Sequence, residues 1–206
     1  MIFEHYCKPM NKVHNHNVFS ISLTFIVTCG FLGKIKYAPG TFGSLAAIPM
    51  MYLMFILSSQ ISVYFIEMYP DVFADVVKLL AFYVTSLLST IVLFIIGCIL
   101  SSIYCKLHNK KDPKEIVIDE LVGQMLTYIF CTPAVFVSND HITQSNNTIS
   151  FYMYILPFIL FRFFDIAKPW PISLADQKIK GGFGVMFDDI IASIFAIVFY
   201  WAIILI

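Results

Sequence analysis

Charged residues are scarce in this chain of 206 residues. Only 13% are Asp, Glu, Lys or Arg, roughly half the share of a soluble domain, whereas 59% are hydrophobic. The mean hydropathy is +0.83. The net charge is zero, so the sequence offers no general electrostatic case for nucleic-acid binding. This composition predicts an all-α fold, a multi-pass bundle of membrane helices.

Paired cysteine motifs, internal repeats and low-complexity tracts are also missing. The five cysteines have no CxxC spacing, so we interpret them as small buried hydrophobic side chains. The apolar run that begins at Val18 has no small-residue cleavage pattern, and a cleaved signal peptide is not expected. We predict a polar tail over residues 1–17 and a single membrane-embedded domain over residues 18–206.

Six apolar runs divide the membrane domain. The first, over residues 18–33, is short for a bilayer span and is expected to be tilted, re-entrant or interfacial. The fifth is also short, which leaves about four to six spans. The later runs cover residues 41–59, 79–104, 116–139, 149–164 and 185–206, and residues 60–78 and 138–148 are predicted to connect spans on one side of the membrane.

Basic residues are distributed unevenly between the connections. Ten of the thirteen Lys and Arg residues lie in residues 33–40, 105–115 and 162–184, whereas residues 60–78 and 138–148 hold one between them. Short loops rich in Lys and Arg face the cytoplasm. The three basic segments are therefore predicted to share the cytoplasmic side.

Five carboxylates fall on that same side, at predicted helix ends. Acidic groups at membrane depth are rare and usually functional. Together they would repel one another, and a hard divalent cation such as Mg²⁺ would neutralise them. The predicted metal ligands and catalytic acids are Asp119, Glu120, Asp165, Asp188 and Asp189.

Basic and glycine-rich groups lie beside these acids. Side chains of Arg162, Lys168 and Lys180 are suited to phosphate oxygens, and Lys168 is also a candidate catalytic residue. Gly181, Gly182 and Gly184 leave backbone N–H groups available to an anion near a helix start. A second helix start follows Pro39, where Thr41 is a predicted N-cap. Candidate phosphate-binding residues there are Thr41, Gly43 and Ser44.

Four motifs in these segments resemble the phosphatidylglycerophosphatase A family in sequence, order and spacing. The motifs are YAPGTFGSL over residues 37–45, DPKEIVIDELVGQ over 112–124, FRFFDIAKPWPI over 161–172 and GGFGVMFDD over 181–189. The resemblance implies a Mg²⁺-dependent phosphatase that converts phosphatidylglycerophosphate, a membrane phospholipid, to phosphatidylglycerol. It also implies a bacterial-type cytoplasmic (inner) membrane and a role in phospholipid biosynthesis.

Two chemical alternatives use the same carboxylates. A membrane transporter would place its acids at mid-bilayer and would show repeated halves, which the sequence lacks. A lipid phosphotransferase would need a longer Asp-rich signature with DG and AR elements, which are also missing. For hydrolysis, the nucleophile would be water activated by the metal or an aspartate. The DxDx[TV] pattern of aspartate-nucleophile phosphatases is absent.

Overall fold

The protein is described here by a computed structural model, which covers residues 18–69, 73–110, 113–137, 151–179 and 181–205. The tail predicted over residues 1–17 lies outside this part of the chain. Every regular element within it is helical, which confirms the predicted all-α class. In order, the elements are α1 (Val18–Val27), the 3-10 helix η1 (Leu32–Lys34), α2 (Pro39–Leu45), α3 (Ala47–Met68), α4 (Ala74–His108), α5 (Ile118–Val137), the π-helix η2 (Phe151–Ile155), α8 (Leu156–Ala167), α9 (Ile172–Lys178) and α10 (Gly182–Leu205).

Three helical segments in the described ranges are long and apolar enough to cross a membrane. They are the continuous stretch Pro39–Met68, formed by α2 and α3, then α4 and α10. The outward faces of α3 and α4 expose large apolar side chains, including Phe55, Leu88 and Ile95, as lipid contact requires. Helix α1 has 10 residues, too few for a span, in keeping with the short first run.

The prediction that residues 60–78 form a connection is wrong over most of that range. Helix α3 continues to Met68 and α4 begins at Ala74. Charged residues suggested a loop, but Glu67 and Asp75 lie on exposed helix ends. Helix ends near the membrane surface accept such side chains because they reach water.

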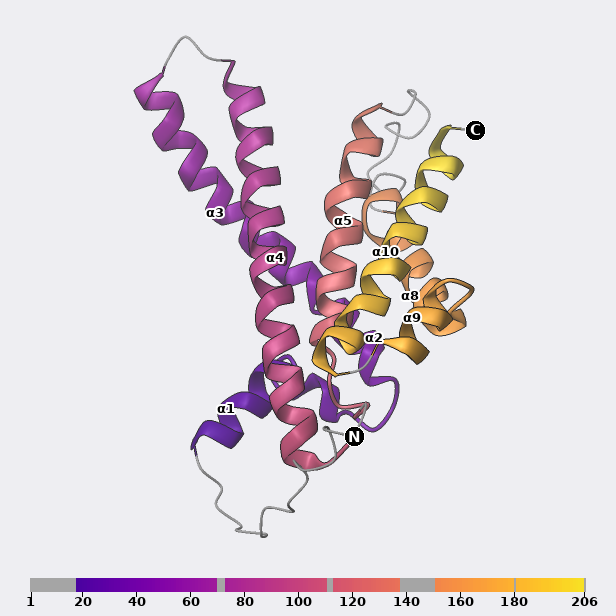
Figure 1. The fold of residues 1–206 in the computed structure, drawn as a ribbon. Coiled ribbons are helices and arrows are strands. Elements are labelled where there is room, and N and C mark those ends of the chain that lie inside the picture. Colours follow the sequence, from indigo (N-terminus) through magenta and orange to yellow (C-terminus); the bar gives the residue numbers. More distant parts are fainter. Residues whose placement is uncertain (1–17, 70–72, 111–112, 138–150, 180, 206) are drawn as a thin grey trace, which may run out of the picture.

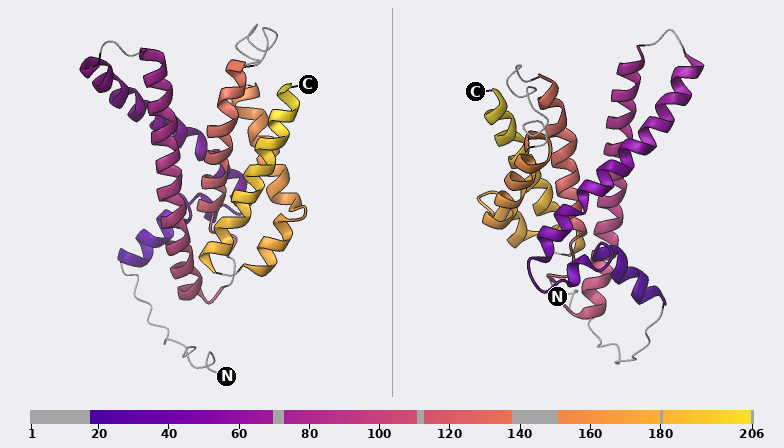
Figure 2. Two further views of the ribbon diagram at one scale, coloured as in Figure 1. Left: turned by 45° about the horizontal axis from the view of Figure 1, so that its top comes forward. Right: turned by 180° about the vertical axis from the view of Figure 1, so that it is seen from behind.

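The helices form two groups that diverge from a common end. Helices α3 and α4 run side by side as one long pair, and α5, α8 and α10 form a second group (Figures 1 and 2). Helix α10 packs against α5, α8 and α4, so it is central to the second group and joins it to the first. Buried side chains of α1, α4, α5 and α10, among them Val27, Tyr104, Val122 and Met186, form a core near the common end.

The three basic segments of the sequence meet at this common end. The start of α2, the C-terminal end of α4, the starts of α5 and α10 and the short helix α9 lie together there, while the C-terminus lies at the other end (Figure 1). The prediction that these segments share one side of the protein is confirmed by a single cavity that residues from all three line.

Candidate active site

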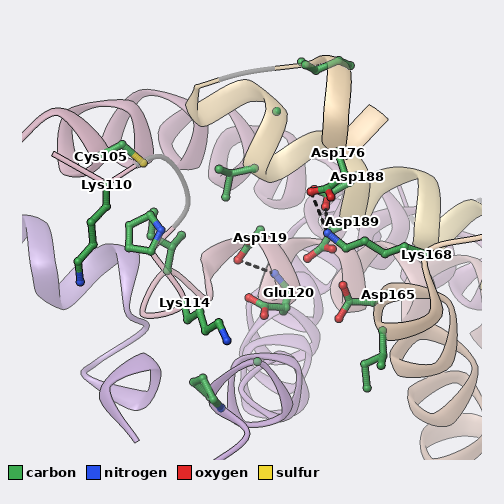
Figure 3. A pocket seen from close by; sticks show the side chains of 18 of the residues that line it. Cys105, Lys110, Lys114, Asp119, Glu120, Asp165, Lys168, Asp176, Asp188 and Asp189 are labelled. Atoms are coloured by element: carbon green, nitrogen blue, oxygen red, sulfur yellow. Dashed lines mark hydrogen bonds and ion pairs between the residues drawn. The ribbon is translucent and has the colours of Figure 1, made fainter. Parts of the chain in front are cut away.

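A cavity of about 830 Å³ lies among the helix ends. Its size is within the usual range for a small-molecule site, roughly 300–1,000 Å³. Charged side chains line it from α4, α5, α8, α9, α10 and the segment before α5 (Figure 3). The acids are Asp119, Glu120, Asp165, Asp176, Asp188 and Asp189, and the bases are Lys106, Lys110, Lys114, Arg162 and Lys168.

Three of the acids form a compact group, which we call the carboxylate triad: Asp119, Glu120 and Asp189. One oxygen from each lies within 4.8 Å of the other two, and Asp189 is only 4% exposed. Asp119 and Glu120 lie in the first turn of α5, where the Glu120 backbone N–H donates to Asp119 Oδ1 at 3.1 Å. Asp189 comes from the second turn of α10, which packs along α5.

The triad has the properties of a binding site for a hard cation. Glu120 Oε2 and Asp189 Oδ2 are buried and have no hydrogen-bond partner in the described part of the chain. None of the three carboxylates forms a salt bridge there. Buried, unpaired carboxylate oxygens are costly unless a cation compensates them, and an all-oxygen donor set suits Mg²⁺. The residues present therefore fit the predicted metal.

The two remaining predicted metal ligands, Asp165 and Asp188, each form an ion pair with a base, and Asp188 Oδ1 is also buried without a hydrogen-bond partner among the described residues. Asp165 Oδ2 forms an ion pair with Arg162 Nη1, one turn earlier on α8, and both side chains are mostly buried. The same Arg162 nitrogen donates to Ser44 Oγ at 3.3 Å. Ser44 in turn donates to the Gly40 carbonyl at 3.0 Å. The start of α2 and the end of α8 are joined through this chain, which fixes the guanidinium at the cavity.

Lys168 lies between two acids, one from α9 and one from α10. Its Nζ donates to Asp188 Oδ2 at 2.6 Å and to Asp176 Oδ1 at 3.0 Å. Burial opposes the charge of Lys168, but these hydrogen bonds outweigh it and raise the pKa of the ammonium above the usual lysine value. Lys168 is the C-cap of α8 with φ of 41°, a left-handed conformation that turns the chain before Pro169.

Gly40 permits close contact between α2 and the triad. A Cβ at this position would collide with Glu120 Oε1 and lie 3.1 Å from Arg162 Nη2. Glycine is therefore needed for the backbone of α2 to approach the Glu120 carboxylate.

The predicted phosphate-binding residues fall into three groups. Thr41, Gly181 and Gly184 line the cavity with Arg162 and Lys168. Three others lie outside its lining: Ser44 holds Arg162, Gly43 packs on Val117, and Gly182 donates its N–H to Ser102 Oγ at 3.0 Å where α10 crosses α4. Lys180 lies outside the described residues. Thr41 is not an N-cap, because α2 begins at Pro39 and its N-cap is Ala38.

Sequence reasoning assigned no site role to four charged residues that line the cavity. They are Asp176, Lys106, Lys110 and Lys114. The three lysines were used only to orient the chain in the membrane, although the same basic loop precedes the Asp119-Glu120 motif. The role of Asp176 cannot be recognised from its spacing in the sequence, because its contact with Lys168 depends on the turn between α8 and α9.

The fold and the site together define a helical membrane protein with an acid-lined, base-flanked cavity at one end of its bundle. A family model described as "Phosphatidylglycerophosphatase A" matches residues 25–204. Phosphatidylglycerophosphatase A of Haemophilus influenzae is 33% identical over 172 residues, which cover 83% of this chain and 82% of that protein. Phosphatidylglycerophosphatase A of Escherichia coli is 31% identical over 164 residues, covering 79% and 72%.

The chain belongs to the phosphatidylglycerophosphatase A family, and it is a membrane phosphatase, a hydrolase of phosphoric monoesters. The suspected family resemblance is thereby confirmed. A relative that matches over a shorter stretch is named putative phosphatidylinositol-3-phosphatase of Bacteroides thetaiotaomicron, 34% identical over 89 residues, or 43% of this chain and 46% of that protein. No solved structure matches.

Proposed function

We propose that this protein hydrolyses the terminal phosphate of phosphatidylglycerophosphate and releases phosphatidylglycerol, in phospholipid biosynthesis. The observation that carries the proposal is the unpaired carboxylate triad beside Arg162 and Lys168 in one cavity. A metal-binding acid group next to phosphate-binding bases is suited to phosphomonoester chemistry. The names of the two bacterial relatives, which cover most of this chain, supply the lipid.

Asp119, Glu120 and Asp189 would hold Mg²⁺. When bound, the ion supplies Lewis-acid stabilisation of phosphate charge and lowers the pKa of water. Asp165 and Asp188 have a different part in this proposal, because each is already paired with a base. They fix the positions of the guanidinium and the ammonium that receive the phosphate.

Arg162 and Lys168 bind the phosphate and stabilise the negative charge that develops on its oxygens. The raised pKa of Lys168 keeps this side chain protonated at neutral pH, so it contributes a fixed positive charge. It is a poor donor of a proton to the departing glycerol oxygen for the same reason. Thr41 and the backbone N–H groups of Gly181 and Gly184 line the cavity beside these groups and offer further donors.

The cavity faces the cytoplasm of a bacterial-type inner membrane in this proposal. Most of the basic residues lie at the cavity end of the bundle, as the positive-inside rule requires. A lipid substrate would keep its acyl chains in the bilayer and place only its headgroup among the helix ends.

The direct test is phosphate release from phosphatidylglycerophosphate by the purified full chain, with Mg²⁺ and with a chelator. Phosphatidate and phosphatidylinositol 3-phosphate serve as comparison substrates. We expect release with Mg²⁺, loss with chelator, and a loss of at least about 100-fold for Asp189→Asn. Asp75→Asn, at the exposed start of α4, is the matched control. Undiminished release by Asp189→Asn would remove the triad from the mechanism, and no release by the wild type would reject the substrate.

A further inference from the structure

Three lysines that the mechanism above does not use also line the cavity. Lys106 is in the last turn of α4, Lys110 follows that helix, and Lys114 precedes α5. Figure 3 shows Lys110 and Lys114 separated across the cavity from Lys168, Asp176 and Asp188. The cavity therefore has an acidic end with paired bases and a second end that is mainly basic.

Two of these three lysines have no ion-pair partner among the residues that the structure describes. Lys110 Nζ forms an ion pair with Glu115 Oε1 at 3.2 Å. Lys106 and Lys114 have no ion pair within the described ranges, and both are exposed at the cavity rim. Two unpaired ammonium groups at the rim favour an anion in this part of the cavity.

Glu115 is held where it neutralises Lys110 and not the other two. Tyr104 on α4 donates its hydroxyl to Glu115 Oε2 at 2.6 Å, while Glu115 Oε1 accepts from Lys110. Both carboxylate oxygens are thus occupied. Tyr104 is buried, which fixes the segment carrying Glu115 and Lys114 against the end of α4.

Membrane orientation alone does not account for the position of these lysines. Lys34, Lys36 and Lys178 lie in the basic segments of the same end, yet they do not line the cavity. Lys106 and Lys114 differ from them because they line the same cavity as the carboxylate triad.

We propose that Lys106 and Lys114 form a second anion subsite, which binds the phosphodiester of the lipid headgroup while the terminal phosphomonoester lies at the acidic end. This inference rests on the proposed function and refines its substrate. Phosphatidylglycerophosphate carries both kinds of phosphate, joined through glycerol, so a headgroup reaching the triad places its diester nearer the rim. The subsite selects substrates with two phosphates over lipids that carry only a monoester.

The test compares two substrates in neutral detergent micelles, where the anionic lipid surface is absent. Short-chain phosphatidylglycerophosphate has both phosphates, and short-chain phosphatidate has only the monoester. The double variant Lys106→Gln/Lys114→Gln is compared with Lys34→Gln/Lys36→Gln, which removes the same charge from the same end outside the cavity lining. We expect the first variant to lower the ratio of kcat/KM values for the two substrates by about tenfold or more, and the control to leave it unchanged.

Inhibition by short-chain phosphatidylglycerol provides a second measurement. This product has the diester but no monoester, so its inhibition constant reports on the subsite alone. We expect the rim variant to weaken inhibition about tenfold. An unchanged substrate ratio and inhibition constant, or equal effects of both double variants, would overturn the subsite and would assign the lysines to general surface electrostatics. A wild-type protein that releases no phosphate from phosphatidylglycerophosphate would instead reject the proposed function.

Discussion

Replacing Asp189 with Asn is expected to have opposite effects on stability and on activity. It removes electrostatic repulsion from the carboxylate triad, and it also removes a proposed metal ligand. Asp189 is nearly fully buried, and its ligand oxygen lies within 4.8 Å of those of Asp119 and Glu120. At that distance and an effective dielectric constant of about 20, each pair of full charges repels by about 3.5 kcal/mol. One carboxyl can bind a proton instead, which limits the strain that the triad imposes on the metal-free fold.

We therefore expect metal-free Asp189→Asn to be more stable than the metal-free wild type, by about 2 kcal/mol, or roughly 4–8 °C in Tm. Mg²⁺ should reverse the order. It should stabilise the wild type by binding the folded state, while the variant, with one ligand fewer, gains little. Activity falls while metal-free stability rises, a combination that ordinary damage to the fold does not produce.

The assay is thermal unfolding of both proteins in detergent, in chelator and across a Mg²⁺ titration. Asp75→Asn is the control, because Asp75 is fully exposed at the opposite end of the bundle, where it forms an ion pair with Lys78. A variant that is less stable than wild type in chelator, or that shows the same Mg²⁺ shift, would refute the assignment of Asp189 to a strained metal site.

Three further predictions concern the surroundings of the triad. Lys168→Gln should lower kcat/KM about 100-fold. Because the pKa of Lys168 is raised, the ratio of wild-type to variant kcat/KM should stay constant up to at least about pH 10. A decline of this ratio near pH 8 would contradict the prediction. Tyr104→Phe should lower the unfolding free energy at pH 7 by about 1–2 kcal/mol. The hydrogen bond from Tyr104 lowers the pKa of Glu115 in the folded protein. The stabilisation from this bond is therefore present above the pKa of about 4.3 in the unfolded chain and is lost as pH falls through the folded pKa. Denaturation at several pH values should show that the difference in unfolding free energy between wild type and Tyr104→Phe disappears in acid. Gly40→Ala should raise the Mg²⁺ concentration for half-maximal activity about tenfold, because the Cβ of the alanine would displace the Glu120 carboxylate. An unchanged Mg²⁺ titration would show that α2 moves enough to accommodate the Cβ.

The positions of the charged helix ends could be predicted from sequence because charges are rare in this chain. Each carboxylate in an apolar run stood out, and the count of basic residues placed three distant segments on one side. The pairing of Arg162 with Asp165 was also accessible, since residues three apart share a face of a helix. The spacing within this motif therefore predicts one of the ion pairs that line the cavity, the pair between Arg162 and Asp165.

The different contacts of Asp188, which pairs with Lys168, and Asp189, which joins the triad, could not be predicted from the sequence. Adjacent residues on a helix point about 100° apart, so only one of the two can join the triad while the other meets Lys168. Which one does so depends on how α10 is rotated against α5 and α8, a result of packing across the whole bundle. The contact of Asp176 with Lys168 likewise depends on the left-handed turn at Lys168.

The bracketing of Lys168 by two acids has a consequence for turnover. Asp188 and Asp176 take two of the three N–H donors of the ammonium in the free enzyme and offset its charge, so an arriving phosphate gains one hydrogen bond and a weakened electrostatic attraction. The same two carboxylates repel the free phosphate that is left behind after hydrolysis. We therefore expect the enzyme to be weakly inhibited by the inorganic phosphate that it produces.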